Sequence, residues 1–158
     1  MNDLVELMRH KRWIDGSYLE LATSATLEGK PELQRELLYW LNHIHIVDQI
    51  FYCHLIGKAH GFSSTVSDEV PEANDLRECM LDLDESLIAL SEQLNSHAAA
   101  ASISFRFTDG ADGRMTRSQM LLHLSTHGLY HLAVSGAHLT KKGIAIPPML
   151  LTTMLHAS

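Results

Sequence analysis

The chain has 158 residues, 46% hydrophobic and 20% charged, a composition typical of one globular domain covering residues 1–158. Its net charge of −7 comes from acidic residues spread along the chain, which argues against nucleic acid as a partner. No apolar run approaches the roughly 18 residues of a membrane span, and the N-terminus lacks a signal-peptide pattern, so we expect no membrane association. Two cysteines without a CxxC motif suit a reducing compartment, so we expect a cytoplasmic protein.

Hydrophobic residues recur with helical spacing in most of the chain and predict long helices. The first is expected over about residues 2–27 and the second over about residues 31–56. Residues 58–73 form a loop longer than a helix connection usually needs. A third helix is then expected over about residues 75–94, with Asn74 as its N-cap.

The last third of the chain interrupts the helices with one short β element. Alternating β-branched and aromatic residues predict a strand over residues 102–108, and residues 114–116 return after a turn. A fourth helix is expected from about Thr116 to just before Gly143, and a short terminal helix over residues 149–155. We therefore predict an all-α four-helix bundle with a short β element before the fourth helix.

Eleven histidines are the unusual feature of the composition. The fourth helix carries His123, His127 and His131 at steps of four, a spacing that stacks side chains on one helix face. Two such imidazoles can bind one metal ion. Because chance alone gives roughly one such pair, the context matters: His127 and His131 share a stripe with Leu124 and Val134. A metal site and a metal-free hydrogen-bond network in the core both fit this pattern.

The second helix offers further ligands in His43, His45 and His54. His43 and His54 are about 16 Å apart along the helix axis, too far to share an ion. His43 and His45 point about 200° apart, so we expect His45 to face solvent or Asp48. His43 is the best third ligand if the second and fourth helices are neighbours; otherwise it is a core histidine with a hydrogen-bond partner. Three neutral imidazoles leave coordination positions open, as in catalytic sites, and suit zinc, nickel, copper or iron.

Several motifs together resemble the DinB-like family, also called YfiT-like metalloenzymes. In the second helix His43 is followed by Asp48, Phe51 and Gly57 in the family's register. The segment 123–131 resembles the family motif HxxxHGxxH. Further matching pieces are Trp13 in the first helix, the short strand at residues 105–110, and the Gly-then-Pro ending at residues 143–148.

This resemblance implies an up-down-down-up bundle with a long crossover, often homodimeric. It implies His43, His127 and His131 as ligands of a divalent metal, commonly nickel or zinc. Asp48 and His123 are candidates to support these ligands without binding the metal, and no catalytic residue is assigned. Characterised relatives include transferases and isomerases that use bacillithiol or mycothiol. The family often continues its last His with Arg-Gly-Gln, whereas here Leu-Ala-Val follows His131.

The leading interpretation is a metal-dependent enzyme, such as an S-transferase or isomerase that uses a low-molecular-weight thiol of the bacillithiol, mycothiol or glutathione type. One alternative is a non-catalytic metal- or ligand-binding bundle of the stress response. Another is a metal-dependent hydrolase, which is disfavoured because no Asp or Glu near the motif is an obvious general base.

Overall fold

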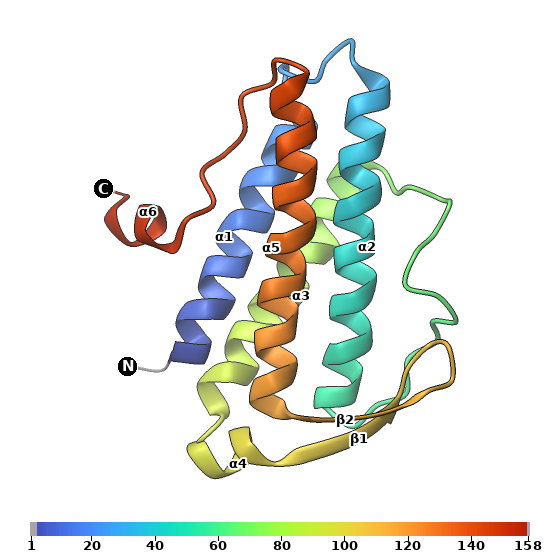
Figure 1. Cartoon of the computed structure of the whole chain (residues 1–158), viewed down its shortest axis with the longest axis vertical. Helices are drawn as coiled ribbons and strands as arrows, with labels where there is room; N and C mark the ends of the chain where they lie inside the picture. Colours follow the sequence, from blue (N-terminus) through green and yellow to red (C-terminus); the bar gives the residue numbers. More distant parts are fainter. Residues whose placement is uncertain (1–2, 158) are drawn as a thin grey trace.

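Four long helices pack as a bundle in the computed structural model, which describes residues 3–157 (Figure 1). The chain runs up in α1, down in α2, crosses back through a long loop, and then runs down in α3 and up in α5. This confirms the predicted up-down-down-up bundle. The bounds of the long helices are α1 Asp3–Thr23, α2 Pro31–Leu55, α3 Ala73–Gln93 and α5 Arg117–Lys141.

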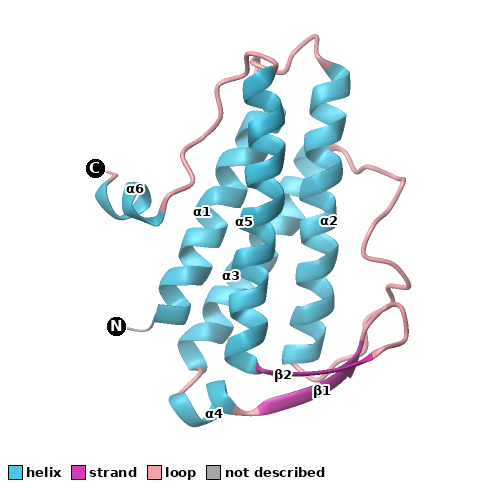
Figure 2. Ribbon diagram, in the orientation of Figure 1, coloured by secondary structure: helices cyan, strands magenta, loops and turns pink. Residues whose placement is uncertain are grey.

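A two-stranded hairpin closes the end of the bundle where α3 ends and α5 begins (Figure 2). Strands β1 (Ser102–Arg106) and β2 (Asp112–Thr116) pair antiparallel, which confirms the expected β element before the last long helix. A short helix, α4 (Ser96–Ala100), precedes the hairpin and was not predicted. It begins at Asn95, whose side chain accepts a hydrogen bond from the amide of Ala98 at 2.9 Å.

Some helix ends differ from their predicted positions. Helix α3 begins at Ala73 after Glu72, so Asn74 lies in the first turn and the prediction that it caps the helix was wrong. Helix α1 ends at Thr23, earlier than expected, because residues 24–30 fold into successive tight turns. The C-terminal helix α6 covers Leu151–His156. Local turn chemistry decides these ends, and hydrophobic spacing does not report it.

Helix pairing brings the second and last long helices together. Helix α1 packs along α3, while α2 packs along α5. At one point α5 approaches α1 so closely that a Cβ on Gly136 would lie 2.6 Å from the hydroxyl oxygen of the fully buried Tyr18. Only glycine fits there, and this contact fixes how α5 lies on the bundle.

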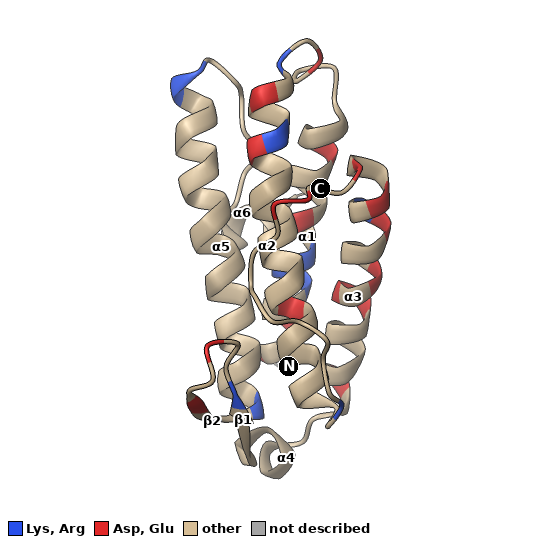
Figure 3. Ribbon diagram, turned by 90° about the vertical axis from the view of Figure 1, so that its right-hand side faces the viewer, with Lys and Arg blue, Asp and Glu red and all other residues tan. Residues whose placement is uncertain are grey.

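Charge is distributed unevenly over the helices (Figure 3). Between Ser118 and Thr140, α5 has no Lys, Arg, Asp or Glu, whereas acidic side chains line α3. The outward face of α5 exposes apolar and aromatic side chains instead, among them Leu122, Tyr130 and Val134. Among residues 3–157, no helix combines the length and apolar character needed to cross a membrane.

Candidate metal centre

Three histidines from α2 and α5 meet in the bundle. Nε2 of His43 lies 3.1 Å from Nε2 of His127 and 3.2 Å from Nε2 of His131. The three rings offer ligand atoms that all lie within 4.8 Å of one another. The structure therefore brings together the three histidines that the sequence singled out, because α2 and α5 are neighbours and the i,i+4 pair on α5 faces α2.

The crossover loop fixes the orientation of His43. Its Nδ1 donates a hydrogen bond to the backbone carbonyl of Thr65 at 2.7 Å, since a carbonyl oxygen can only accept. In the neutral ring, Nε2 then carries the lone pair, and that lone pair points at His127 and His131. A backbone carbonyl in this position is a common partner of metal-binding histidines. The sequence did not predict that Thr65 would accept this hydrogen bond, because no local pattern links the loop to His43.

Two aromatic side chains hold the rings of the centre in place. Trp40 stacks on His131, with ring centroids 4.9 Å apart and planes at 16°, and its edge contacts His43 at 5.8 Å. Tyr130 contacts His131 edge-on at 5.1 Å. Neither residue was predicted from the sequence. A signal was available, because Trp40 lies one helical turn before His43 and Tyr130 is adjacent to His131.

The two histidines that α5 contributes to the centre are poor bases. Burial, together with smaller effects of the neighbouring His131, His43 and His123 and of the Lys11 charge, lowers the pKa of His127 to about 3. Burial and His43 also lower the pKa of His131. Both rings are therefore neutral near pH 7, and protons do not compete for their lone pairs.

The donor set fits a divalent transition metal. Zn–N bonds of about 2.0–2.1 Å in a tetrahedral site put two ligand nitrogens about 3.3 Å apart, close to the observed 3.1 and 3.2 Å. The buried Nδ1 of His127 has no hydrogen-bond partner within the described residues. Neutral imidazole nitrogens suit zinc and nickel equally, so the identity of the metal stays a prediction.

The other histidines and Asp48 lie away from the free ring nitrogens of the centre. The His123 ring packs between Phe51 and His127, with centroids 4.9 and 5.4 Å away. Asp48 contacts Lys11 at 2.6 Å. The expectation that His45 faces solvent or Asp48 was wrong on exposure, because His45 is only 8% exposed. Helix α2 is buried on most of its sides, so residues about 200° apart are both inside.

A second buried cluster joins three helices beside the histidines. Lys11 Nζ of α1 lies 2.5 Å from Asp15, 2.6 Å from Asp48 of α2 and 2.9 Å from Asp84 of α3. The three carboxylates also lie within 4.8 Å of one another, a spacing that could hold a metal ion. Here the lysine ammonium provides the positive charge. Burial alone lowers the pKa of Lys11, but the three carboxylates outweigh it and raise that pKa well above its usual value.

Comparison with known proteins identifies the family. The model of the DinB family matches residues 1–157. No curated protein and no solved structure matches the chain significantly. The match covers both helices that carry the three histidines, the bundle and the hairpin before α5. The chain therefore belongs to the DinB family.

Proposed function

We propose that this protein is a metal-dependent enzyme in which His43, His127 and His131 hold a divalent ion, nickel or zinc. It acts either as an S-transferase that joins a low-molecular-weight thiol to an electrophile, or as an isomerase that uses such a thiol and returns it. The observation that carries the proposal is the convergence of three histidine Nε2 atoms on one point. Family membership supports it. When bound, such an ion supplies Lewis acidity that lowers the pKa of a coordinated thiol.

The residues of the chain have separate parts in this proposal. His43 is oriented by Thr65 of the crossover loop, and His131 is flanked by Trp40 and Tyr130. Trp40 covers the face of the His131 ring on which it stacks, whereas Tyr130 is itself largely exposed. Because all three protein ligands are neutral, the full charge of the ion remains available to stabilise an anionic sulfur.

The structure offers little support for the hydrolase alternative. A hydrolase of this kind needs a free carboxylate near the metal as general base. The buried carboxylates nearest in the fold, Asp15, Asp48 and Asp84, all bind Lys11. Burial, opposed by Lys11, raises the pKa of Asp48 to about 7, so this carboxyl is largely protonated below neutral pH.

Metal content tests the centre. Protein purified without a tag or added metal is expected to contain about one ion per chain by elemental analysis. His43→Ala and His127→Ala should lose it, while His97→Ala, which changes an exposed histidine of α4, should keep it. Full occupancy in both site variants would overturn the assignment.

Thiol consumption tests the catalytic half. The metal-loaded protein should consume bacillithiol, mycothiol or glutathione in the presence of an electrophile, and a chelator should abolish the reaction. If thiol consumption continues unchanged in the metal-free protein, the mechanism is wrong. If the loaded protein binds metal but neither consumes thiol with any electrophile nor isomerises one in the presence of thiol, the non-catalytic metal-binding bundle replaces the enzyme.

The homodimer expected from the resemblance also remains a proposal. The outward face of α5 favours it, because a chain of net charge −7 meets no like-charge repulsion on a face without charged side chains. Light scattering should give the mass of two chains, and Val134→Glu on that face should give the mass of one. A monomeric wild type would contradict the proposal.

A further inference from the structure

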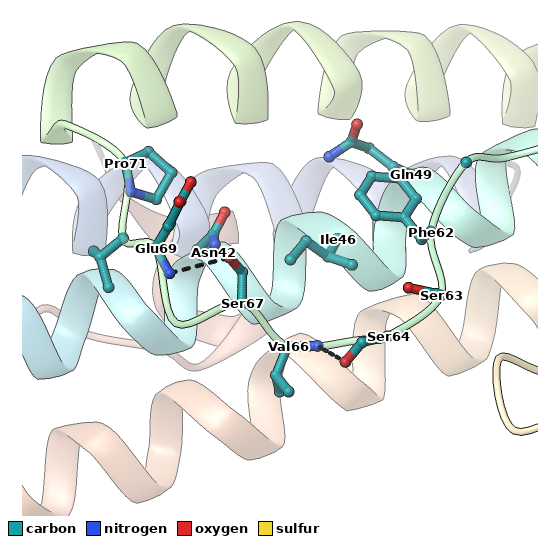
Figure 4. Close-up of a pocket in the computed structure, with 12 residues that line it drawn as sticks. Asn42, Ile46, Gln49, Phe62, Ser63, Ser64, Val66, Ser67, Glu69 and Pro71 are labelled. Atoms are coloured by element: carbon teal, nitrogen blue, oxygen red, sulfur yellow. Dashed lines mark hydrogen bonds between the residues drawn. The ribbon is translucent and has the colours of Figure 1, made fainter.

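A pocket lies under the crossover loop, on the side of α2 that faces α3, and contains none of the metal-centre histidines (Figure 4). Its floor is formed by Asn42, Ile46 and Gln49, which are spaced four and three residues apart on α2. Its other wall is the loop segment between Gly61 and Pro71. The volume of this crossover pocket is about 710 Å³, enough for a small organic molecule.

One polar side chain of the pocket has no hydrogen-bond partner within the described residues. Asn42 is only 7% exposed, and its amide makes no hydrogen bond to any residue of the part of the chain that the structure describes. Figure 4 shows this amide between α2 and the loop residues Ser67 and Glu69. The amide atoms of Asn42 are not among the fully buried side-chain atoms without a partner, so they open onto the pocket, where water or a ligand can reach them. A bound molecule that hydrogen-bonds the amide would satisfy it.

The lining of the pocket selects the chemistry of that molecule. Its polar groups are the amides of Asn42 and Gln49, serine hydroxyls from the loop, and the carboxylate of Glu69. Amides and hydroxyls both donate and accept hydrogen bonds, as hydroxyl and amine groups of a ligand require. No Lys, Arg or His lines the pocket, although carboxylate and phosphate groups are usually recognised by such cations. Ile46 and Phe62 supply apolar surface for a carbon skeleton.

The crossover pocket and the metal centre share two structural elements. Asn42 precedes His43 on α2, so their side chains point into neighbouring sectors of the helix. Thr65, whose carbonyl holds His43, lies between Ser64 and Val66, and both of these line the pocket. A molecule bound in the pocket therefore packs against the segment that orients a metal ligand.

We propose that the crossover pocket binds a hydroxyl- or amine-rich, non-acidic part of the substrate, through hydrogen bonds to Asn42 and Gln49. That the bound molecule is the substrate rests on the proposed function. The class of ligand rests on the pocket lining alone. This assigns a recognition role to Asn42 that is separate from metal binding by its neighbour His43.

Three sugars of one ring type, differing in charge, test the ligand class. Glucose is neutral, glucosamine is cationic and glucuronate is anionic. In NMR titrations of the full chain, glucose and glucosamine should shift the side-chain amide signals of Asn42 and Gln49 saturably. Glucuronate should bind at least about tenfold more weakly, because it meets Glu69 and no cation. Equal or tighter binding of glucuronate, or no binding of the other two sugars, would overturn the proposal.

Substitutions separate recognition from folding. Asn42→Leu should weaken glucosamine binding at least about tenfold, yet unfold at no lower urea concentration than the wild type, since no hydrogen bond within the protein is lost. Gln93→Leu, which changes an exposed amide at the end of α3, should leave binding unchanged. Unaltered binding by Asn42→Leu would refute the role of Asn42. Metal content is measured in the same samples: if it is normal while the sugars fail to bind, the pocket proposal fails and the metal centre stands.

Discussion

Two buried clusters in this bundle each bring three candidate metal ligands within 4.8 Å, yet they solve the problem of buried charge in opposite ways. The carboxylates of Asp15, Asp48 and Asp84 surround the ammonium of Lys11, a cation that the chain itself provides. In the histidine centre no lysine or arginine of the described residues pairs with the ligand atoms, and the Nε2 atoms of three imidazoles point at one another. The first cluster contains its own cation, whereas the second has the geometry to hold an ion from solution.

Proton binding follows the same division. Burial raises the pKa of Asp48 to about 7 and the pKa of Asp84 well above its usual value, and Lys11 opposes both shifts. The carboxyl cluster therefore keeps protons at a higher pH than free carboxyl groups would. Burial lowers the pKa of His127 to about 3, so the histidine centre releases them. Both shifts reduce buried charge. The carboxyl cluster thus links three helices through Lys11, whereas the unprotonated ring nitrogens of the histidine centre keep their lone pairs free.

Removing the cation of the carboxyl cluster should have the largest effect. Lys11→Met leaves three buried carboxyl groups without their positive partner and should lower the free energy of unfolding by about 3–5 kcal/mol, measured by urea denaturation. Arg12→Met is the matched control, because the neighbouring Arg12 pairs with Glu85 where both side chains are more than a third exposed. It should cost less than about 1 kcal/mol. Equal losses in the two variants would contradict a special role for Lys11.

The raised pKa of Asp48 should make the stability of the protein depend on pH. The pKa of Asp48 is raised in the folded state, from 3.8 to about 7, so its contribution to stability is full below pH 3.8 and is lost as the pH rises through about 7. Asp48→Asn keeps an oxygen that accepts from Lys11 but cannot ionise. The wild type should therefore lose stability relative to this variant between pH 4 and pH 8, by on the order of a few kcal/mol. A difference that grows in favour of the wild type over that range would reverse the assignment.

The two clusters were not equally visible in the sequence. His127 and His131 are four residues apart on one helix and share its apolar stripe, so local geometry alone pairs them. His43 needed the family register and the pairing of α2 with α5. The carboxyl cluster went unnoticed, because its members come from three helices and a lysine is usually read as a surface residue. The pair Lys11 and Asp15 does lie on the apolar stripe of α1, which was the available signal.

The surroundings of the α2 histidines could not be predicted from the helical periodicity of the sequence. Helical spacing assigned one inward face to α2 and therefore placed His45 outside. Both His43 and His45 are nevertheless buried, and the loop's backbone supplies the partner of His43 at Thr65. Contacts from a segment without regular structure leave no periodic trace in either partner. The fold was thus predictable from the helices, whereas the surroundings of the site depended on tertiary contacts.

Added metal should stabilise the protein only through the histidine centre. At a free nickel or zinc concentration about 100 times the Kd, the free energy of unfolding should rise by about 2.7 kcal/mol, seen as a higher melting temperature. His127→Ala should remove this gain. His123→Ala, one helical turn away on α5, should keep it, because His123 packs against His127 and hydrogen-bonds none of the three ligands. A metal-dependent shift that survives in His127→Ala would place the ion elsewhere.

The smallest effect should come from the aromatic ring beside the centre. Trp40→Ala removes the stack on His131 and the edge contact with His43, so both rings gain freedom that metal binding must remove. Stacks of this kind contribute about 0.5–1.5 kcal/mol, which corresponds to roughly a two- to tenfold weaker Kd, measured by competition with a chromophoric chelator. Trp40→Phe keeps a flat ring at the same position and should recover most of the affinity. If alanine and phenylalanine both leave the Kd unchanged, Trp40 does not help to orient the ligands. The helices and Thr65 alone then hold the three histidines in place, much as Lys11 alone holds the carboxyl cluster together.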